Sequence, residues 1–306
     1  MYLKKKTYYL ILLCFIPLLS MAQQLQQFSQ YMYNTVAVNP AYAGSRERLN
    51  ITLLNRNQWV GVNGAPITQM FSVHSSIPGT NLGVGLSFIN DKLGYENSTY
   101  IFADASYTIK LNDDYRLSLG MKFGMSRYGL KADLLSDPSA IGDQYLDKIF
   151  NKWKTNIGAG LYLRSDKWYL GISAPRLFNY DNPTDIEYVA IDRVSSYLIG
   201  GYMYKMNPRL KFKPTFLVKY TNGAPVSVDL TANFLLNNKL WLGVAYRVTE
   251  SFGALMSLNV SDNFKFGYSY EFNTSTLNAY TSGSHELFVS YEFDFPKPRC
   301  NCENVF

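Results

Sequence analysis

The sequence RLSLGMKFGMS at residues 116–126 decides the fold of this chain. Apolar side chains occupy every second position of the stretch, and small or polar side chains occupy the positions between them. Because successive side chains of a β-strand point to opposite faces of the sheet, the stretch predicts a strand with one apolar and one polar face. The same alternation recurs at 226–236, 264–272 and 285–295. A sheet of such strands separates two different environments.

Similar segments follow one another from residue 50 to residue 295. We predict about fourteen strands, an even number as in bacterial membrane barrels, at residues 50–59, 66–77, 82–90, 99–110, 116–127, 153–164, 168–175, 194–205, 209–220, 226–236, 240–249, 252–260, 264–272 and 285–295.

The connections between these strands alternate in length. Every second one is short and rich in turn residues, such as Pro78-Gly79-Thr80-Asn81 and Ser261-Asp262-Asn263. Most of the others are longer, above all 128–152, 176–193 and 273–284, although the one around residues 249–251 is short. Short periplasmic turns opposite longer outer loops are typical of outer-membrane barrels.

We therefore predict an all-β fold, an antiparallel transmembrane β-barrel of about 14 strands of the outer-membrane type. Every backbone amide in hydrocarbon needs a partner, so such a sheet must close on itself. Four tryptophans near predicted strand ends fit the aromatic girdles of the two membrane interfaces. As an alternative, they are ordinary core or edge residues. They are Trp59, Trp153, Trp168 and Trp241.

The composition agrees with this fold and excludes a nucleic-acid binder. Only 17% of the residues are charged, whereas 16% are aromatic. Lys4, Lys5 and Lys6 contribute half of the net charge of +6, which leaves 29 − 3 = 26 basic against 23 acidic residues. The remaining charges are scattered, whereas a nucleic-acid interface needs a clustered basic face.

The N-terminus predicts export. A basic start, an apolar run from Tyr8 to Leu19 and small residues before Gln23 make residues 1–22 a signal peptide, with cleavage after Ala22. We predict a polar lead-in at 23–49, periplasmic or entering the barrel, then the barrel at 50–295 and a periplasmic tail at 296–306.

Several motifs in a fixed order resemble those of the PorP/SprF family, membrane proteins of the type IX secretion system. They cover nearly the whole chain after the signal peptide and read FSQYMYN at 28–34, NPAYAGS at 39–45, RNQWVG at 56–61, GAP at 64–66, YLGIS at 169–173, GYSY at 267–270 and GSHE at 283–286.

The resemblance implies a barrel in the outer membrane that assists export of cargo bearing C-terminal sorting domains. SprF-type members serve large surface adhesins, including those used in gliding. PorP-type members associate with the periplasmic ring and with peptidoglycan-linked parts of the machine. The expected partners are thus other secretion components, the cargo and outer-membrane lipid.

The sequence predicts no catalytic, cofactor or metal site. Ser284-His285-Glu286 is not a catalytic triad, since neighbours on a strand point to opposite faces. The runs Gly83-Val84-Gly85 and Gly158-Ala159-Gly160 lie in strands without a following helix, so they fit glycines that face a crowded lumen. In the tail, Cys300 and Cys302 form a strained disulfide or stay free thiols.

The predicted polar face carries both signs of charge, at Asp104, Lys110, Arg116, Lys122, Arg164, Lys219, Asp229, Arg247, Glu271 and Glu292. Such a lining either forms ion-pair networks that fill the lumen, which we favour, or surrounds an aqueous channel. The alternative function is therefore a channel for small solutes. For partner binding we predict the loop aromatics Tyr180, Tyr188 and Tyr280.

Overall fold

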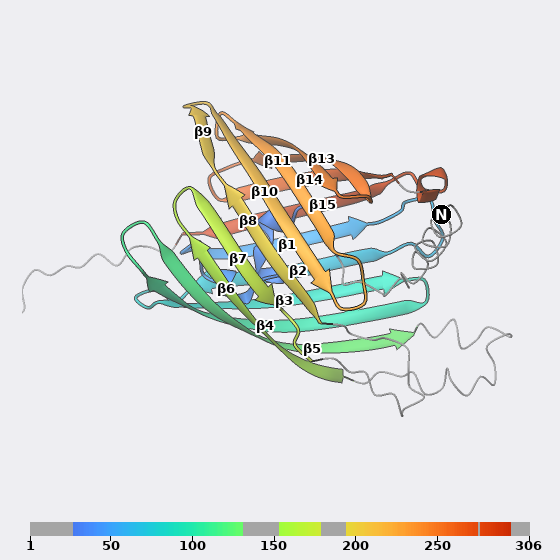
Figure 1. Cartoon of the computed structure of the whole chain (residues 1–306), viewed down its shortest axis with the longest axis horizontal. Helices are drawn as coiled ribbons and strands as arrows, with labels where there is room; N and C mark the ends of the chain where they lie inside the picture. Colours follow the sequence, from blue (N-terminus) through green and yellow to red (C-terminus); the bar gives the residue numbers. More distant parts are fainter. Residues whose placement is uncertain (1–26, 131–152, 179–193, 275, 295–306) are drawn as a thin grey trace, which may run out of the picture.

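The computed structural model describes residues 27–130, 153–178, 194–274 and 276–294, and these residues form a barrel of antiparallel strands (Figure 1). The strands are Leu49–Asn57 (β1), Ile67–Ser76 (β2), Leu82–Leu93 (β3), Glu96–Lys110 (β4), Arg116–Leu130 (β5), Trp153–Arg164 (β6), Trp168–Ala174 (β7), Ser195–Tyr202 (β8), Tyr204–Asn207 (β9), Leu210–Thr221 (β10), Ser227–Leu236 (β11), Leu240–Arg247 (β12), Ser251–Asn259 (β13), Phe264–Asn273 (β14) and Ser284–Phe293 (β15).

Apart from β8 and β9, strands that follow one another in sequence pair with each other, and β1 pairs with β15 through contacts such as Leu53 opposite Val289. The sheet is therefore closed. Strands β8 and β9 both pair with β10, so together they form a single strand of the wall, interrupted at Met203. The wall thus has 14 strands, as predicted. The predicted strand at 194–205 is the one that the structure divides.

The two faces of the wall differ as the alternation predicts. On β5, the outward Met121 is 52% exposed, whereas the neighbouring Lys122 is fully buried on the luminal side. Large apolar side chains are exposed on strands all around the wall, among them Leu86, Phe123 and Val244. An apolar exterior on a closed sheet suits a lipid bilayer. No helix in the described ranges is long and apolar enough to cross a membrane.

The two ends of the barrel carry different connections. The short-turn end has the turns at 77–81, 111–115, 165–167, 208–209, 237–239 and 260–263. The opposite, long-loop end carries the remaining connections, including 58–66 and 274–283. Two connections at this end are tight, since only residues 94–95 separate β3 from β4 and only 248–250 separate β12 from β13. The first of them is shorter than expected, because β3 and β4 extend further than the alternation indicates.

One tryptophan departs from the expected girdles. Trp241, on β12, is buried on the luminal side and not at a membrane interface. Trp59, Trp153 and Trp168 lie at or next to strand ends.

The centre of the barrel is occupied by the chain that precedes β1. We call residues 27–48 the luminal segment. It contains three short 3-10 helices, Tyr31–Tyr33 (η1), Thr35–Ala37 (η2) and Pro40–Tyr42 (η3); a fourth, Thr276–Ala279 (η5), lies in the loop before β15. Buried aromatic and aliphatic residues of the luminal segment pack against inward side chains from several strands.

Candidate functional site: the filled lumen

The luminal segment runs along the length of the barrel. Near the long-loop end, the Gln27 amide donates to Asp229 at the start of β11. Near the short-turn end, the Arg46 guanidinium pairs with Glu292 at the end of β15. The segment therefore spans the interior between the two openings.

The local sequence explains why this segment is compact without being a regular helix. The Asn39 side chain accepts a hydrogen bond from the Ala41 amide at 3.0 Å, which caps η3, and Pro40 provides its fixed φ at the first position. The same side chain donates to the Leu161 carbonyl of β6 at 2.9 Å. A single asparagine thus both forms the turn and attaches it to the wall.

A cluster of buried charges anchors the start of the luminal segment, and we call it the outer ion cluster. Arg56 of β1 pairs with Glu271 of β14 at 3.1 Å and with Glu286 of β15 at 3.2 Å. The Ser29 and Gln30 amides both donate to the Glu286 carboxylate at 2.9 Å. Hydrogen bonds to a charged acceptor are the strong kind, so this carboxylate fixes the backbone of the segment.

The same cluster extends along the wall through a second arginine. Arg247 of β12 lies 2.7 Å from Asp229 and 3.3 Å from Glu271. Ser251 donates to Glu271 at 3.0 Å. Carboxylates and guanidinium groups from five strands (β1, β11, β12, β14 and β15) therefore form one ion-pair network on one side of the segment.

A second buried ion pair holds the middle of the segment. Lys122 of β5 lies 2.7 Å from Asp104 of β4, and both side chains are fully buried. The same ammonium donates to the Val36 carbonyl at 3.2 Å. Further carbonyls of the segment are bonded in the same manner, since Ser173 donates to Val38 and Ser106 to Ala43, each at 2.7 Å.

Glycines in the wall make room for the segment. A Cβ atom at Gly120 would overlap the backbone of Ala41, and one at Gly160 would overlap the Asn39 side chain. A Cβ atom at Gly83 would overlap the Ala43 carbonyl. The prediction that glycines in these runs face a crowded lumen is thus confirmed for Gly83 and Gly160, and the crowding group is the luminal segment.

Two tyrosines of η1, the buried Tyr31 and the partly buried Tyr33, complete the attachment. The Tyr31 hydroxyl lies 2.8 Å from the Thr215 hydroxyl of β10, and Ser257 of β13 donates to the Tyr33 hydroxyl at 3.0 Å. Both hydroxyls are therefore hydrogen-bonded to the wall. The Tyr33 ring also stacks on Phe288, with 4.7 Å between the ring centroids.

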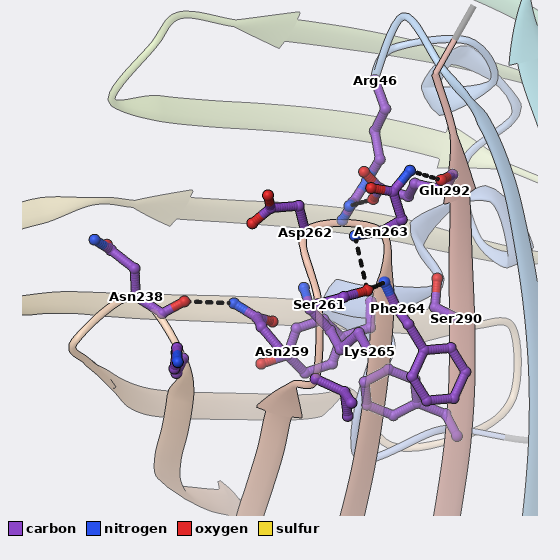
Figure 2. Close-up of a pocket in the computed structure, with 14 residues that line it drawn as sticks. Arg46, Asn238, Asn259, Ser261, Asp262, Asn263, Phe264, Lys265, Ser290 and Glu292 are labelled. Atoms are coloured by element: carbon purple, nitrogen blue, oxygen red, sulfur yellow. Dashed lines mark hydrogen bonds and ion pairs between the residues drawn. The ribbon is translucent and has the colours of Figure 1, made fainter.

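Two pockets open beside Arg46 at the short-turn end. The smaller pocket, of about 240 Å³, lies between the turns 237–239 and 260–263 and the end of β15. Figure 2 shows Asn259 donating to the Asn238 carbonyl on one side of it, and Arg46 beside Glu292 on the other. The larger, which we call the rim pocket, has a volume of about 630 Å³ and lies between residues 43–48, the turn 76–83 and the ends of β4, β5 and β6.

The predicted residues fall into two groups. All ten charged residues predicted on the polar face lie on luminal strand positions, and several of them form the ion pairs described above. Of the predicted partner-binding residues, Tyr280 is 76% exposed at the long-loop end. Tyr180 and Tyr188 lie outside the described residues, as do Cys300 and Cys302.

The two histidines do not share a site. His285 points away from its buried neighbours Ser284 and Glu286, and its Nδ1 lies 2.6 Å from the Tyr268 hydroxyl. His74 is buried in the lumen, where its Nδ1 faces the Gly44 amide. Within the described ranges, no group of three or more His, Cys, Asp or Glu residues is placed to hold a metal ion.

The sequence profile of the family described as "Type IX secretion system membrane protein PorP/SprF" matches residues 20–291. The chain belongs to the PorP/SprF family. The match includes the luminal segment and all but the last residues of the barrel, so the PorP/SprF barrel contains both parts. It is a component of type IX secretion in the outer membrane, and the family is not an enzyme class. No curated protein matches the chain in sequence.

Among solved structures, this PorP/SprF chain is similar to other barrels. The outer-membrane protein Omp33 of Acinetobacter baumannii has 8% identity and a TM-score of 0.47, with 81% of this chain and 99% of that chain covered. A mutant of the TodX monoaromatic hydrocarbon channel has 10% identity and a TM-score of 0.49, with 85% and 94% covered. At these values the likeness carries no argument about function.

Proposed function

We propose that this PorP/SprF barrel assists the export or surface attachment of cargo proteins with C-terminal sorting domains, such as large adhesins, including those used in gliding, and that it contacts the periplasmic machinery. The observation that carries the proposal is the occupied lumen within a family of secretion proteins. A segment anchored at the long-loop opening by buried charges and at the short-turn opening by the partly exposed pair of Arg46 and Glu292 suits a rigid docking platform better than a passage for solutes.

The proposed working surfaces are the two ends of the barrel. Tyr280, with Tyr180 and Tyr188, would bind cargo or another component from the long-loop end. The short-turn end, which faces the periplasm in barrels of this type, would meet the machinery. Residues 1–22 would direct export and be removed after Ala22, the tail at 296–306 would lie in the periplasm, and the protein would have no enzymatic activity and no cofactor.

The first experiment compares surface and culture-fluid proteins of the parent strain and of a clean deletion of this gene by quantitative proteomics. Loss of one or a few sorting-domain proteins is the result expected of a dedicated accessory, and loss of nearly all of them that of a core component. If every sorting-domain protein is exported normally, the proposal is wrong and a channel for small solutes becomes the leading alternative.

The second experiment tests the tyrosine at the long-loop end. Tyr280→Ala removes an exposed ring, so it should lower cargo export and leave the amount of folded barrel unchanged. Tyr95→Ala is the matched control, because Tyr95 is an exposed tyrosine in a turn at the same end. Equal export by both variants would remove Tyr280 from the proposed binding surface.

A further inference from the structure

Three cations stand side by side on the luminal face of the short-turn end. Lys110 of β4 lies directly opposite Arg116 of β5, and Arg116 lies directly opposite Arg164 of β6. Like charges in directly opposite positions destabilise a sheet. The positions are luminal, so contact with lipid does not explain them. A row of this kind needs another reason, and the binding of an anion is one.

The row forms one wall of the rim pocket. Arg46 and Arg48 of the luminal segment line the same pocket, so its lining holds five basic residues against two acidic ones, Glu47 and Asp294. Its volume of about 630 Å³ lies within the range of binding pockets for organic ligands.

Carboxylates in the described ranges pair with some of these five basic residues and leave others unpaired or weakly paired. Arg46 pairs with Glu292, and Arg48 lies 2.8 Å from Asp294, so the cations of the luminal segment are paired. The cations of the wall have weaker ion pairs. Arg164 lies 3.4 Å from Glu47, whose side chain is 66% exposed.

Arg116 stands at the centre of the row and is the least neutralised. In the described part of the chain no carboxylate lies within ion-pairing distance of it, and the buried Nε atom of its neighbour Arg164 has no hydrogen-bond partner there. Among the described residues, the ion-pair partner of Lys110 is the local turn residue Asp113, at 2.7 Å, and both of these side chains are exposed. An exposed pair of this kind contributes little. At the centre of the row, an incoming carboxylate would therefore meet guanidinium N–H donors that no carboxylate of the described residues occupies.

We propose that the rim pocket binds a carboxylate-bearing segment of a periplasmic protein partner. Guanidinium groups bind carboxylates through two parallel hydrogen bonds, and the polar wall residues Ser76 and Thr108 offer further partners to a peptide. Apolar side chains in the lining, Ile77 and Leu82, fit the aliphatic parts of such a segment. The identity of the partner as a secretion component rests on the proposed function, but the binding itself does not.

A lipid phosphate would satisfy the same cations but is less suited to their position. The three cations point into the lumen, whereas the apolar neighbours Ile109 and Leu119 point outward to the acyl chains. A headgroup would have to leave its leaflet and cross the rim of the wall to reach Arg116. A water-borne peptide reaches the pocket directly from the periplasmic opening.

The test measures fluorescence anisotropy of a short labelled peptide rich in Asp and Glu, titrated with the purified full-length protein in neutral detergent. The probe should bind, a probe of the same length with Asn and Gln in place of the acids should not, and added salt should weaken binding. Arg116→Gln should lower the affinity about tenfold, the effect of one charge-assisted hydrogen bond.

Lys167→Gln is the matched control, because it removes one positive charge from an exposed turn at the same end but outside the pocket. Its affinity should equal that of the unchanged protein. Retained heat-modifiable migration in electrophoresis verifies that each variant is folded.

Three outcomes would overturn the inference. The first is equal binding of the acidic and neutral probes, and the second is an equal loss of affinity in Arg116→Gln and Lys167→Gln. The third is displacement of the probe by vesicles of anionic phospholipid at a lipid concentration at which vesicles of neutral phospholipid have no effect. The last result would assign the pocket to lipid phosphate. Because binding is measured on the purified protein, its failure leaves the result of the deletion strain untouched.

Discussion

At the scale of single residues, the unusual feature of this molecule is how much charge is buried inside it. Arg56 is 2% exposed and the Glu286 side chain is fully buried. Removing such groups from water costs several kcal/mol per ion, and only complete pairing offsets that cost. In the outer ion cluster the pairing is shared with the backbone amides of Ser29 and Gln30. The charges therefore position the luminal segment more than they stabilise the barrel.

Replacing Arg56 tests this balance. Arg56→Met leaves Glu286 without a counter-ion, so we expect the free energy of unfolding to fall by about 3 kcal/mol. The measurement is urea unfolding of the protein in lipid vesicles, followed by tryptophan fluorescence.

Two controls define the cause. The double variant Arg56→Met/Glu286→Gln removes both charges and leaves Glu271 its partner Arg247, so it should regain most of the lost stability. Arg209→Gln removes an exposed arginine at the short-turn end and should change stability by less than about 0.5 kcal/mol. A single variant as stable as the unchanged protein would contradict the assigned role of Arg56.

At the scale of elements, the strands could be predicted from the sequence, whereas for residues 23–49 the sequence left two alternatives open, a periplasmic lead-in or a segment that enters the barrel. A wall between lipid and a polar interior forces a period of two, and β5 or β14 shows it without interruption. The luminal segment has no such period, because its short 3-10 helices bury Gln30, Asn34 and Asn39 as fully as they bury apolar residues. A stretch that mixes polar and apolar residues without a regular period looks like an irregular loop.

The sequence feature that indicates the luminal segment is a set of glycines on the strands of the wall. Gly83 and Gly160 are luminal positions where a side chain is missing, and the sequence indicated crowding there without identifying its source. Gly120 shows the same absence on the strand that decides the fold. The rim pocket could not be predicted either, because Lys110, Arg116 and Arg164 become neighbours only through strand register.

Removing the luminal segment should open the barrel. A variant without residues 27–45 loses the groups that fill the interior and should give steady single-channel currents in planar bilayers, while the unchanged protein should give none.

A second variant protects the test if the deleted chain does not fold. Gly120→Val keeps the whole chain but places a side chain where the backbone of Ala41 lies, so it should give a smaller current. Gly253→Ala is its control, since the new Cβ would meet its nearest atom at 3.3 Å. Steady currents from the unchanged protein would show that the segment does not close the lumen.

At the scale of the whole molecule, the two ends of the barrel define a direction across the membrane. The short turns, the rim pocket and the last residues of β15 share one end, and Tyr280 lies at the other. In barrels of this type short turns face the periplasm. The cargo and the machinery would therefore meet the protein on opposite sides.

Cysteine labelling of intact cells tests this orientation. In a Cys300→Ser/Cys302→Ser background, Tyr280→Cys should react with a membrane-impermeant maleimide on intact cells because Tyr280 is 76% exposed at the long-loop end. Asp113→Cys, in the turn after β4, should react only after the outer membrane is permeabilised. The opposite labelling pattern would reverse the orientation and move the rim pocket to the cell surface.

The position of the luminal segment also sets the order in which this protein can be completed. The segment directly precedes β1, yet the amide of Ser29 is bonded to Glu286, 257 residues later in the chain. Contacts between residues so distant in sequence form slowly, because the chain between them must first be ordered. A chain that ends before β15 lacks both the last anchor of the segment and the strand that pairs with β1, and it keeps two open sheet edges that invite aggregation. Addition of β15 therefore closes the wall and anchors the luminal segment at the same time. A chain that lacks β15 has neither a closed wall nor an anchored segment.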